Sequence, residues 1–166
     1  LLALERIKRE VWSAASARTK HRLLISTAFV HLTFGDTAKS IDYFREASAT
    51  DPGKPWSLTA LAYAELLAGS LAAAFSYAQK ALAEDSTLEN AAVALIHASP
   101  RDLSLEDLQQ IVPDGLQEKA QILCALTNAA RDRGLDDDAL ILAERAYTKE
   151  PNNWRAQALL ASELLR

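Results

Sequence analysis

Three glycines in this chain open the same pattern of residues, and their spacing limits what the chain can fold into. Five residues after Gly35, Gly69 and Gly134 stands a small residue, followed directly by an apolar one. The first two glycines lie 34 residues apart, and the last two lie 65 apart, which is one unit of 34 and one of 31. A fixed period of this size is the signature of stacked helical units. We therefore expect an array of antiparallel helix pairs.

Small residues mark the places where these helices should cross. In the second helix of each unit, small or aromatic residues recur at positions separated by four and three: Ser40, Phe44 and Ala47; Ala74, Ala78 and Ala81; Ala139, Ala143 and Ala146. Matching positions of the first helices carry Ala28, Ala62, Thr127 and Ala161. Alanine buries little area, so its use here is to let helix axes approach closely. Glycine reaches the left-handed backbone of a helix C-cap without strain, so Gly69 should end the helix before it.

The pattern resembles the tetratricopeptide repeat, which is built from two antiparallel helices per 34 residues. Signature positions are occupied in the first unit by Leu24, Ala28, Gly35, Ser40, Phe44, Ala47 and Pro52; in the second by Leu58, Leu61, Ala62, Gly69, Ala74, Ala78 and Ala81; and in the fourth by Leu123, Leu126, Gly134, Ala139, Ala143, Ala146 and Pro151. Thr27 and His31 replace the usual large residues, and Ser86 stands where proline is usual. The resemblance covers about residues 21–166.

The resemblance implies an all-α, right-handed solenoid of stacked antiparallel pairs. Its units are placed at 21–54, 55–88, 89–119, 120–153 and 154–166, the last being a partial unit or a capping helix. We expect first helices near 21–34, 55–68, 89–99, 117–133 and 152–165. Second helices are expected near 37–50, 71–84, 104–112 and 137–149.

The third unit is three residues short. Pro100 should end its first helix, because proline cannot continue one. Ser104 followed by Asp107 resembles a capping box, which predicts a second short helix over Leu105 to Val112. Pro113-Asp114-Gly115 predicts a turn. The loss of three residues from this unit is interpreted either as sequence drift in a fold that tolerates it or as a bend that shapes a binding site.

Residues 1–20 are interpreted as an N-terminal helix that caps the array or forms the end of a degenerate preceding unit. Basic residues gather in and just after this segment: Arg6, Lys8, Arg9, Arg18, Lys20 and Arg22. Glu5 and Glu10 interrupt the cluster and the whole chain has a net charge of −4, which argues against nucleic acid as a partner. The chain has no initiator Met, so we expect it to be a piece of a longer protein.

No residue pattern predicts catalysis, a cofactor or a metal. Cys124 is the only cysteine, so the chain forms no internal disulfide, and a structural thiol is the favoured interpretation. The three histidines lack metal-ligand spacing. Asp136-Asp137-Asp138 lacks the alternation of an EF-hand and instead suits the positive end of a helix dipole. We expect a protein that is not an enzyme.

In the tetratricopeptide family, the first helices line a concave groove through the second, fifth, ninth and twelfth positions of each unit. Carried over by register, these positions are Arg22, Ile25, Phe29, Leu32, Trp56, Thr59, Tyr63, Leu66, Asn90, Val93, His97, Gln121, Cys124, Asn128 and Arg131. Members that clamp the C-terminal carboxylates of chaperones carry Lys at the fifth position and Asn at the ninth of one repeat. Apart from Asn128 this chain lacks those residues, so a clamp of that type is not expected.

The N-terminal half of this expected groove is apolar and aromatic, which suits an amphipathic helix or an extended apolar peptide. Phe29, Trp56 and Tyr63 are expected to lie near one another with their rings partly exposed. The alternative is that these rings simply pack between repeats, as half-buried aromatic residues often do.

The function indicated is a non-catalytic scaffold or adaptor that binds a peptide or helix of another protein. The alternative is a regulatory sensor arm of a larger NTPase or transcription regulator, in which the array contacts a ligand or another domain of its own chain. The sequence shows neither a membrane-spanning run nor a signal peptide. We therefore expect a soluble protein, with the cytoplasm slightly favoured.

Overall fold

The computed structural model describes residues 15–165, and within them every regular element is a helix. In chain order these are α2 (Ala17–Thr33), α3 (Thr37–Ser48), α4 (Pro55–Leu67), α5 (Leu71–Glu84), α6 (Glu89–His97), α7 (Leu105–Ile111), α8 (Asp114–Gln117), α9 (Ala120–Asp132), α10 (Asp136–Lys149) and α11 (Trp154–Leu164). The expected all-α fold is confirmed. None of these helices combines the length and apolar character needed to cross a bilayer. The helix proposed for residues 1–20 falls mostly outside the described residues.

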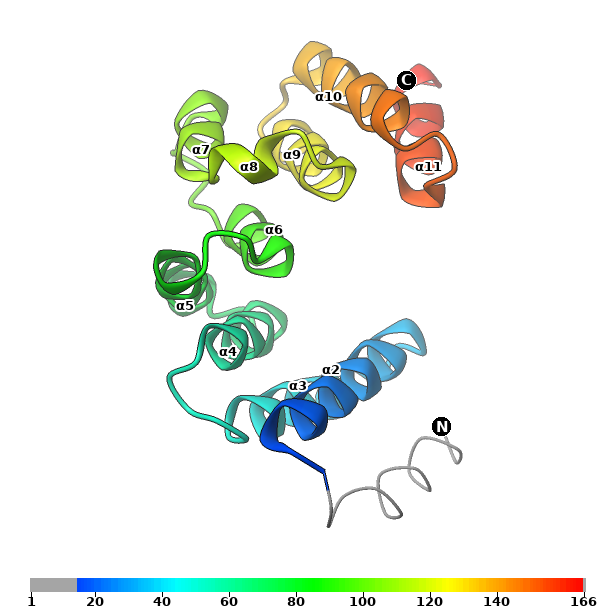
Figure 1. Cartoon of the computed structure of the whole chain (residues 1–166). Coiled ribbons are helices and arrows are strands. Elements are labelled where there is room, and N and C mark those ends of the chain that lie inside the picture. Colours follow the sequence, from blue (N-terminus) through cyan, green and yellow to red (C-terminus); the bar gives the residue numbers. More distant parts are fainter. Residues whose placement is uncertain (1–14, 166) are drawn as a thin grey trace.

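The helices form an arc in which successive pairs stack side by side (Figure 1). Helix α2 packs against α3, α4 against α5, and α9 against α10, and each of these pairs is a first helix with its second helix. Seen in Figure 1, α5 and α7 lie along the outer side of the arc, whereas α4, α6 and α9 lie nearer its inner side. This arrangement places the first helices where they can line a concave surface.

Gly69 ends α4 in the way that the sequence predicts. Its φ is +81°, which is the left-handed region that a side chain strains. Its amide donates to the Leu66 carbonyl at 3.1 Å, and the next amide, of Ser70, donates to the Glu65 carbonyl at 2.8 Å. These two bonds are a Schellman motif and satisfy carbonyls that the helix end leaves free. The same pair of bonds recurs at the other two repeat glycines, so one local device closes three of the first helices.

The small residues of the repeat lie at the helix crossings. All of the following have no accessible surface: Ala28, Ser40, Phe44, Ala47, Ala62, Ala74, Ala78, Ala81, Ala139, Ala143 and Ala146. Ala161, which stands at the equivalent position of the fifth unit, is exposed. The reason is that α11 is followed by no second helix within the described residues, so nothing there packs on that side of it.

The compressed third unit departs from a simple hairpin. Helix α7 packs chiefly on α9 instead of on α6, while α6 packs against α4, α5 and α9 (Figure 1). The capping box is confirmed, since Ser104 Oγ accepts from the Asp107 amide at 3.0 Å and donates to its carboxylate at 2.6 Å. The expected turn at Pro113 is wrong in detail, because Asp114–Gln117 forms the single helical turn of α8. As a result the first helix of the fourth unit begins at Ala120 and not near 117.

Two other helix ends also refine the expectation. Helix α2 begins at Ala17, four residues before the expected unit start, because Ser16 caps it by accepting from the Thr19 amide at 3.2 Å. Helix α10 begins at Asp136, which places all three consecutive aspartates in its first turn. Their charges there meet the positive end of the helix dipole, as expected.

Candidate functional site

A groove of about 1190 Å³ runs along the inner side of the arc. One wall is formed by the C-terminal halves of α2 and α4, by α6 and by one face of α9. The opposite wall is formed by the turn at 150–153 and by α11. The lining residues are Phe29, Leu32, Thr33, Tyr63, Leu66, Leu67, Val93, His97, Gln121, Cys124, Ala125, Asn128, Arg131, Glu150, Pro151, Asn152, Asn153, Trp154, Arg155, Ala158, Leu159 and Ser162.

Most of the residues that the repeat register assigns to a concave surface lie in this groove. They are Phe29, Leu32, Tyr63, Leu66, Val93, His97, Gln121, Cys124, Asn128 and Arg131. The assigned residues that do not line it are Arg22, Ile25, Trp56, Thr59 and Asn90. All five belong to the N-terminal halves of α2, α4 and α6. The arc therefore closes around the C-terminal halves of these helices, while α9 contributes nearly its whole inner face.

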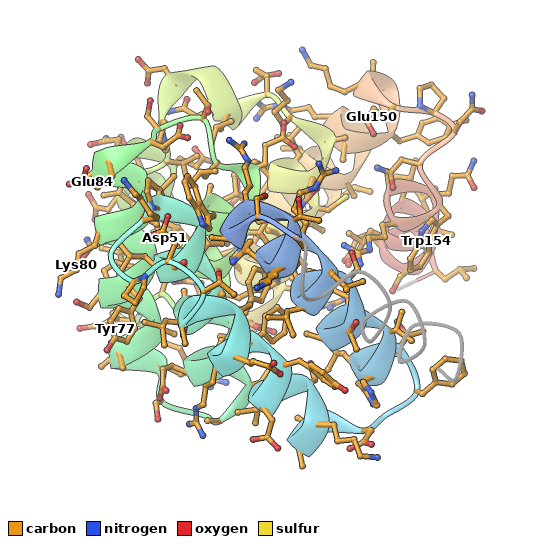
Figure 2. All side chains as sticks on the ribbon, turned by 60° about the horizontal axis from the view of Figure 1, so that its bottom comes forward. Asp51, Tyr77, Lys80, Glu84, Glu150 and Trp154 are labelled. Carbon is orange, nitrogen blue, oxygen red and sulfur yellow. The ribbon has the colours of Figure 1, made fainter. Side chains whose placement is uncertain are left out.

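The α11 wall was missing from the sequence-based set, although the same register contains it. If the fifth unit starts at Trp154, its second, fifth and ninth positions are Arg155, Ala158 and Ser162, and all three line the groove. The turn at 150–153 carries no such signal, because it lies between units. Figure 2 shows Glu150 and Trp154 flanking this turn, at the edge of the view opposite Lys80 and Glu84 of α5.

The apolar end of the groove rests on an aromatic cluster of Phe29, Phe44 and Tyr63. The Phe29 ring meets the Tyr63 ring edge to face, with centroids 5.4 Å apart, and the Phe44 ring stacks on Tyr63 at 5.3 Å. Tyr63 is only 9% exposed and Phe44 is fully buried, so Phe29 is the half-buried member that faces the groove. Leu32, Leu66 and Leu67 extend this apolar surface.

The expected grouping of Phe29, Trp56 and Tyr63 is therefore only partly right. Tyr63 is buried against Phe29 and Phe44, and Trp56 belongs to a different contact. The Trp56 ring lies edge to face with His21, with centroids 6.5 Å apart, and the Arg18 guanidinium lies 5.3 Å from its centroid. For Tyr63 the packing alternative is correct, because its ring packs against Phe29 of α2 and Phe44 of α3, whose own centroids lie 5.2 Å apart.

The other end of the groove is polar, and its side chains hold one another in place. Arg131 forms an ion pair with Glu163 of α11 at 3.6 Å and donates to the side-chain oxygen of Asn128 at 2.7 Å. The Gln121 amide donates to the Asn90 side chain at 3.0 Å, which joins α9 to α6. Glu150 accepts from the Asn153 amide at 2.9 Å. These contacts fix the side chains of the polar wall, in which Arg131 is ion-paired and Glu150 is hydrogen-bonded to a neutral amide.

Three of the side chains that line the groove, Tyr63, His97 and Cys124, have a shifted pKa, and burial is the largest cause for each. It raises the pKa of the Tyr63 hydroxyl and of the Cys124 thiol, and it lowers the pKa of His97. His97 keeps accessible surface, but the walls around it displace enough water to disfavour its charged form. In all three the cation of Arg155 adds a smaller downward effect.

Cys124 is therefore a neutral thiol at physiological pH. Since the thiolate is the nucleophile and the metal ligand, this environment does not activate Cys124. Among residues 15–165, no three His, Cys, Asp or Glu side chains gather in a way that could hold a metal ion. The chemistry that the groove offers is apolar contact, hydrogen bonding and charge.

No protein-family model matches the chain, and no curated protein matches its sequence. Among solved structures, a chain of the APC/C hetero-tetramer Cut9–Hcn1 is similar, with a TM-score of 0.61 and 17% sequence identity. The match covers 87% of this chain and 30% of that one, so this chain spans less than a third of its length. A thermophilic TPR protein from Thermus thermophilus matches 88% of this chain and 100% of its own, at 18% identity and a TM-score of 0.46.

The match to the Cut9–Hcn1 chain covers 87% of this chain, so the two proteins share a fold over most of its length. It agrees with the repeat spacing, the glycine-closed first helices and the alanine-lined crossings. The chain folds as a TPR-like α-solenoid of stacked helix pairs.

Proposed function

We propose that this chain is a non-catalytic protein-interaction module whose groove binds a peptide or helical segment of a partner protein. The observation that carries the proposal is the convergence of α2, α4, α6, α9 and α11 on one groove of about 1190 Å³. Its apolar surface at Phe29 and Leu66 continues into a wall of amide and charged side chains. A segment with one apolar and one polar face fits such a surface.

The size of the groove favours a peptide over a small molecule. Pockets for small ligands usually measure roughly 300–1,000 Å³ and enclose most of the ligand. This groove is larger, and its walls come from helices far apart in the sequence. The neutral Cys124 thiol further supports a binding role, because it supplies no activated nucleophile.

The proposal is tested by selecting binders from a phage-displayed library of random peptides about four helical turns long. Ala158 lines the groove and is exposed on α11, so Ala158→Trp should fill the groove without disturbing the core. The matched control is Ala83→Trp, at an exposed position of α5 that does not line the groove. Figure 2 shows α5, marked by Tyr77, Lys80 and Glu84, at the edge of the view opposite α11.

We expect the selected peptides to lose most of their affinity for Ala158→Trp and to keep it for Ala83→Trp. Matching circular dichroism and melting curves would establish that both variants fold. Peptides that bind both variants as well as the parent chain would overturn the groove as the binding site, and so would a selection that enriches none.

A further inference from the structure

Arg155 is a charged residue that lines the groove from α11. It is the second residue of α11, lines the groove and is exposed, with its guanidinium 5.4 Å from the centroid of the Trp154 ring. Tyr63 of α4, His97 of α6 and Cys124 of α9 line the same groove, and the Arg155 charge slightly lowers the pKa of each. Arg155 therefore faces three first helices across the groove.

The other charges that line the groove already have partners. Arg131 is paired with Glu163, and Glu150 accepts a hydrogen bond from Asn153. Asp132, the last residue of α9, does not line the groove, and its charge raises the pKa of His97. Within residues 15–165, no carboxylate forms an ion pair with Arg155. Arginine stays protonated at every physiological pH, so this cation is permanent.

Any segment that fills the groove must cover Arg155. Removing water from an unpaired guanidinium is costly unless the incoming surface supplies an anion. A carboxylate supplies that anion and matches the planar fork of the guanidinium with two parallel hydrogen bonds. A neutral or basic segment would leave the cation desolvated and unpaired, so the same residue that favours acidic partners disfavours others.

We propose that the segment bound in this groove is an apolar one that carries an acidic side chain, and that Arg155 pairs with this carboxylate. This inference rests on the proposed function and specifies the chemistry of the partner. The carboxylate is assigned to a side chain and not to a chain terminus. The reason is that the positions used to clamp a terminal carboxylate hold Ile25, Phe29, Thr59 and Tyr63 here.

The first test repeats the peptide selection in parallel on the parent chain, on Arg155→Gln and on Arg101→Gln. Arg101 is the matched control, since it is exposed and does not line the groove. We expect the peptides selected by the parent chain and by Arg101→Gln to be rich in Asp and Glu as well as in apolar residues. The acidic enrichment should be absent from those selected by Arg155→Gln.

The second test uses one selected peptide, synthesised with its C-terminus amidated, and its Glu→Gln counterpart. The loss of one charged hydrogen-bonded pair should weaken binding to the parent chain and to Arg101→Gln by about tenfold. The same change should alter binding to Arg155→Gln by less than about twofold. Titration calorimetry at constant ionic strength gives the affinities.

The outcomes separate this inference from the function on which it rests. Peptides that bind in the groove without acidic residues, or a Glu→Gln effect that persists in Arg155→Gln, would overturn the role of Arg155 and leave the groove as a peptide site. A gain in affinity from freeing the C-terminus of the Gln peptide, lost in Arg155→Gln, would assign the carboxylate to a chain end and overturn the side-chain assignment. Failure to select any groove-dependent peptide would overturn the function itself.

Discussion

The guanidinium of Arg133 donates a 2.9 Å hydrogen bond to the carbonyl of Pro100, which lies three residues after the end of α6, the short first helix of the compressed repeat. The same side chain also donates to the Leu103 carbonyl at 3.0 Å, to the Ser99 hydroxyl at 3.0 Å and to the Ala129 carbonyl at 2.9 Å. One arginine just after α9 thus ties down the loop between α6 and α7. This explains how α7 can pack on α9 although its own unit is too short to form a full hairpin.

Replacing Arg133 with lysine should destabilise the chain by about 1–3 kcal/mol, because lysine keeps the charge but cannot reach four acceptors with a planar fork. Urea denaturation measures the change as a lower midpoint. Arg101→Lys, in the same loop but exposed, is the control and should leave the midpoint nearly unchanged. Equal midpoints for the two variants would show that the bonds to Arg133 do not hold the loop.

Phe44→Ala should cost about 3–5 kcal/mol of stability, since it removes a large buried side chain and leaves a cavity under Tyr63. Phe44 has no accessible surface, whereas Phe34 is 72% exposed, so Phe34→Ala is a control with the same chemical change. We expect Phe34→Ala to change stability by no more than about 0.5 kcal/mol. Thermal and urea unfolding of both variants decide the point, and a mild effect of Phe44→Ala would mean that the aromatic cluster is not part of the core.

Ala74→Leu and Ala139→Leu should each cost about 1–3 kcal/mol, because a larger side chain overpacks a crossing where the alanine has no accessible surface. Ala72→Leu is the matched control, at an exposed position two residues away from Ala74 on α5. Leucine is nearly as good a helix former as alanine, so helix propensity alone predicts almost no change. A melting curve unaffected by Leu at position 74 would show that the register of the repeats is wrong.

His21 should make the chain less stable in mild acid. Burial lowers its pKa from the ordinary 6.5; its bond to the Ala47 carbonyl works in the opposite direction, and nearby Arg18 adds a further lowering. As the pH falls below 6.5, the unfolded chain therefore takes up a proton at this histidine before the folded chain does. The stability that neutral His21 supports is present above that pH and is lost as the pH falls toward the lowered folded-state pKa.

His21→Asn isolates this effect. The asparagine amide can replace the ring nitrogen that lies 3.1 Å from the Ala47 carbonyl, but it cannot titrate in this range. We expect the urea midpoint of the parent chain to fall more steeply between about pH 7.5 and about pH 5.5 than that of the variant. His97, whose pKa is also lowered, is present in both proteins, so its contribution cancels. If the urea midpoints of the parent chain and of the variant fell with pH at the same slope, His21 would not be a source of the acid sensitivity.

The sequence predicted the helices well wherever a local signal was present. Gly69 requires φ > 0, Ser104 has a capping partner three residues on, and the alanines recur at helical spacing, so each feature can be identified without tertiary information. No such signal exists at α8, where Pro113-Asp114-Gly115 is compatible with either a turn or one turn of helix. Packing of Leu116, which is buried, favours the helix there.

The candidate groove could also be predicted only in part, because local signals in the sequence do not fix its shape. The repeat register identifies one face of each first helix, but it does not state how far successive pairs rotate. In the folded chain this rotation leaves Trp56 against His21 and Arg18, outside the groove, and brings Arg155 into the same groove as Tyr63. The unit that contains Arg155 would have been included if the register had been continued past Trp154.

The sequence by itself determined the repeat, the ends of most helices and the close helix crossings, because backbone conformation at glycine and side-chain volume at alanine act over a few residues. Tertiary structure alone decided that α7 packs on α9, that Tyr63 is buried against Phe29 and Phe44, and that α11 forms the second wall of the groove. Each of these depends on the sum of many interhelical angles along the arc. A shift of a few degrees at each crossing would change which side chains meet across the groove while leaving every local signal in the sequence the same.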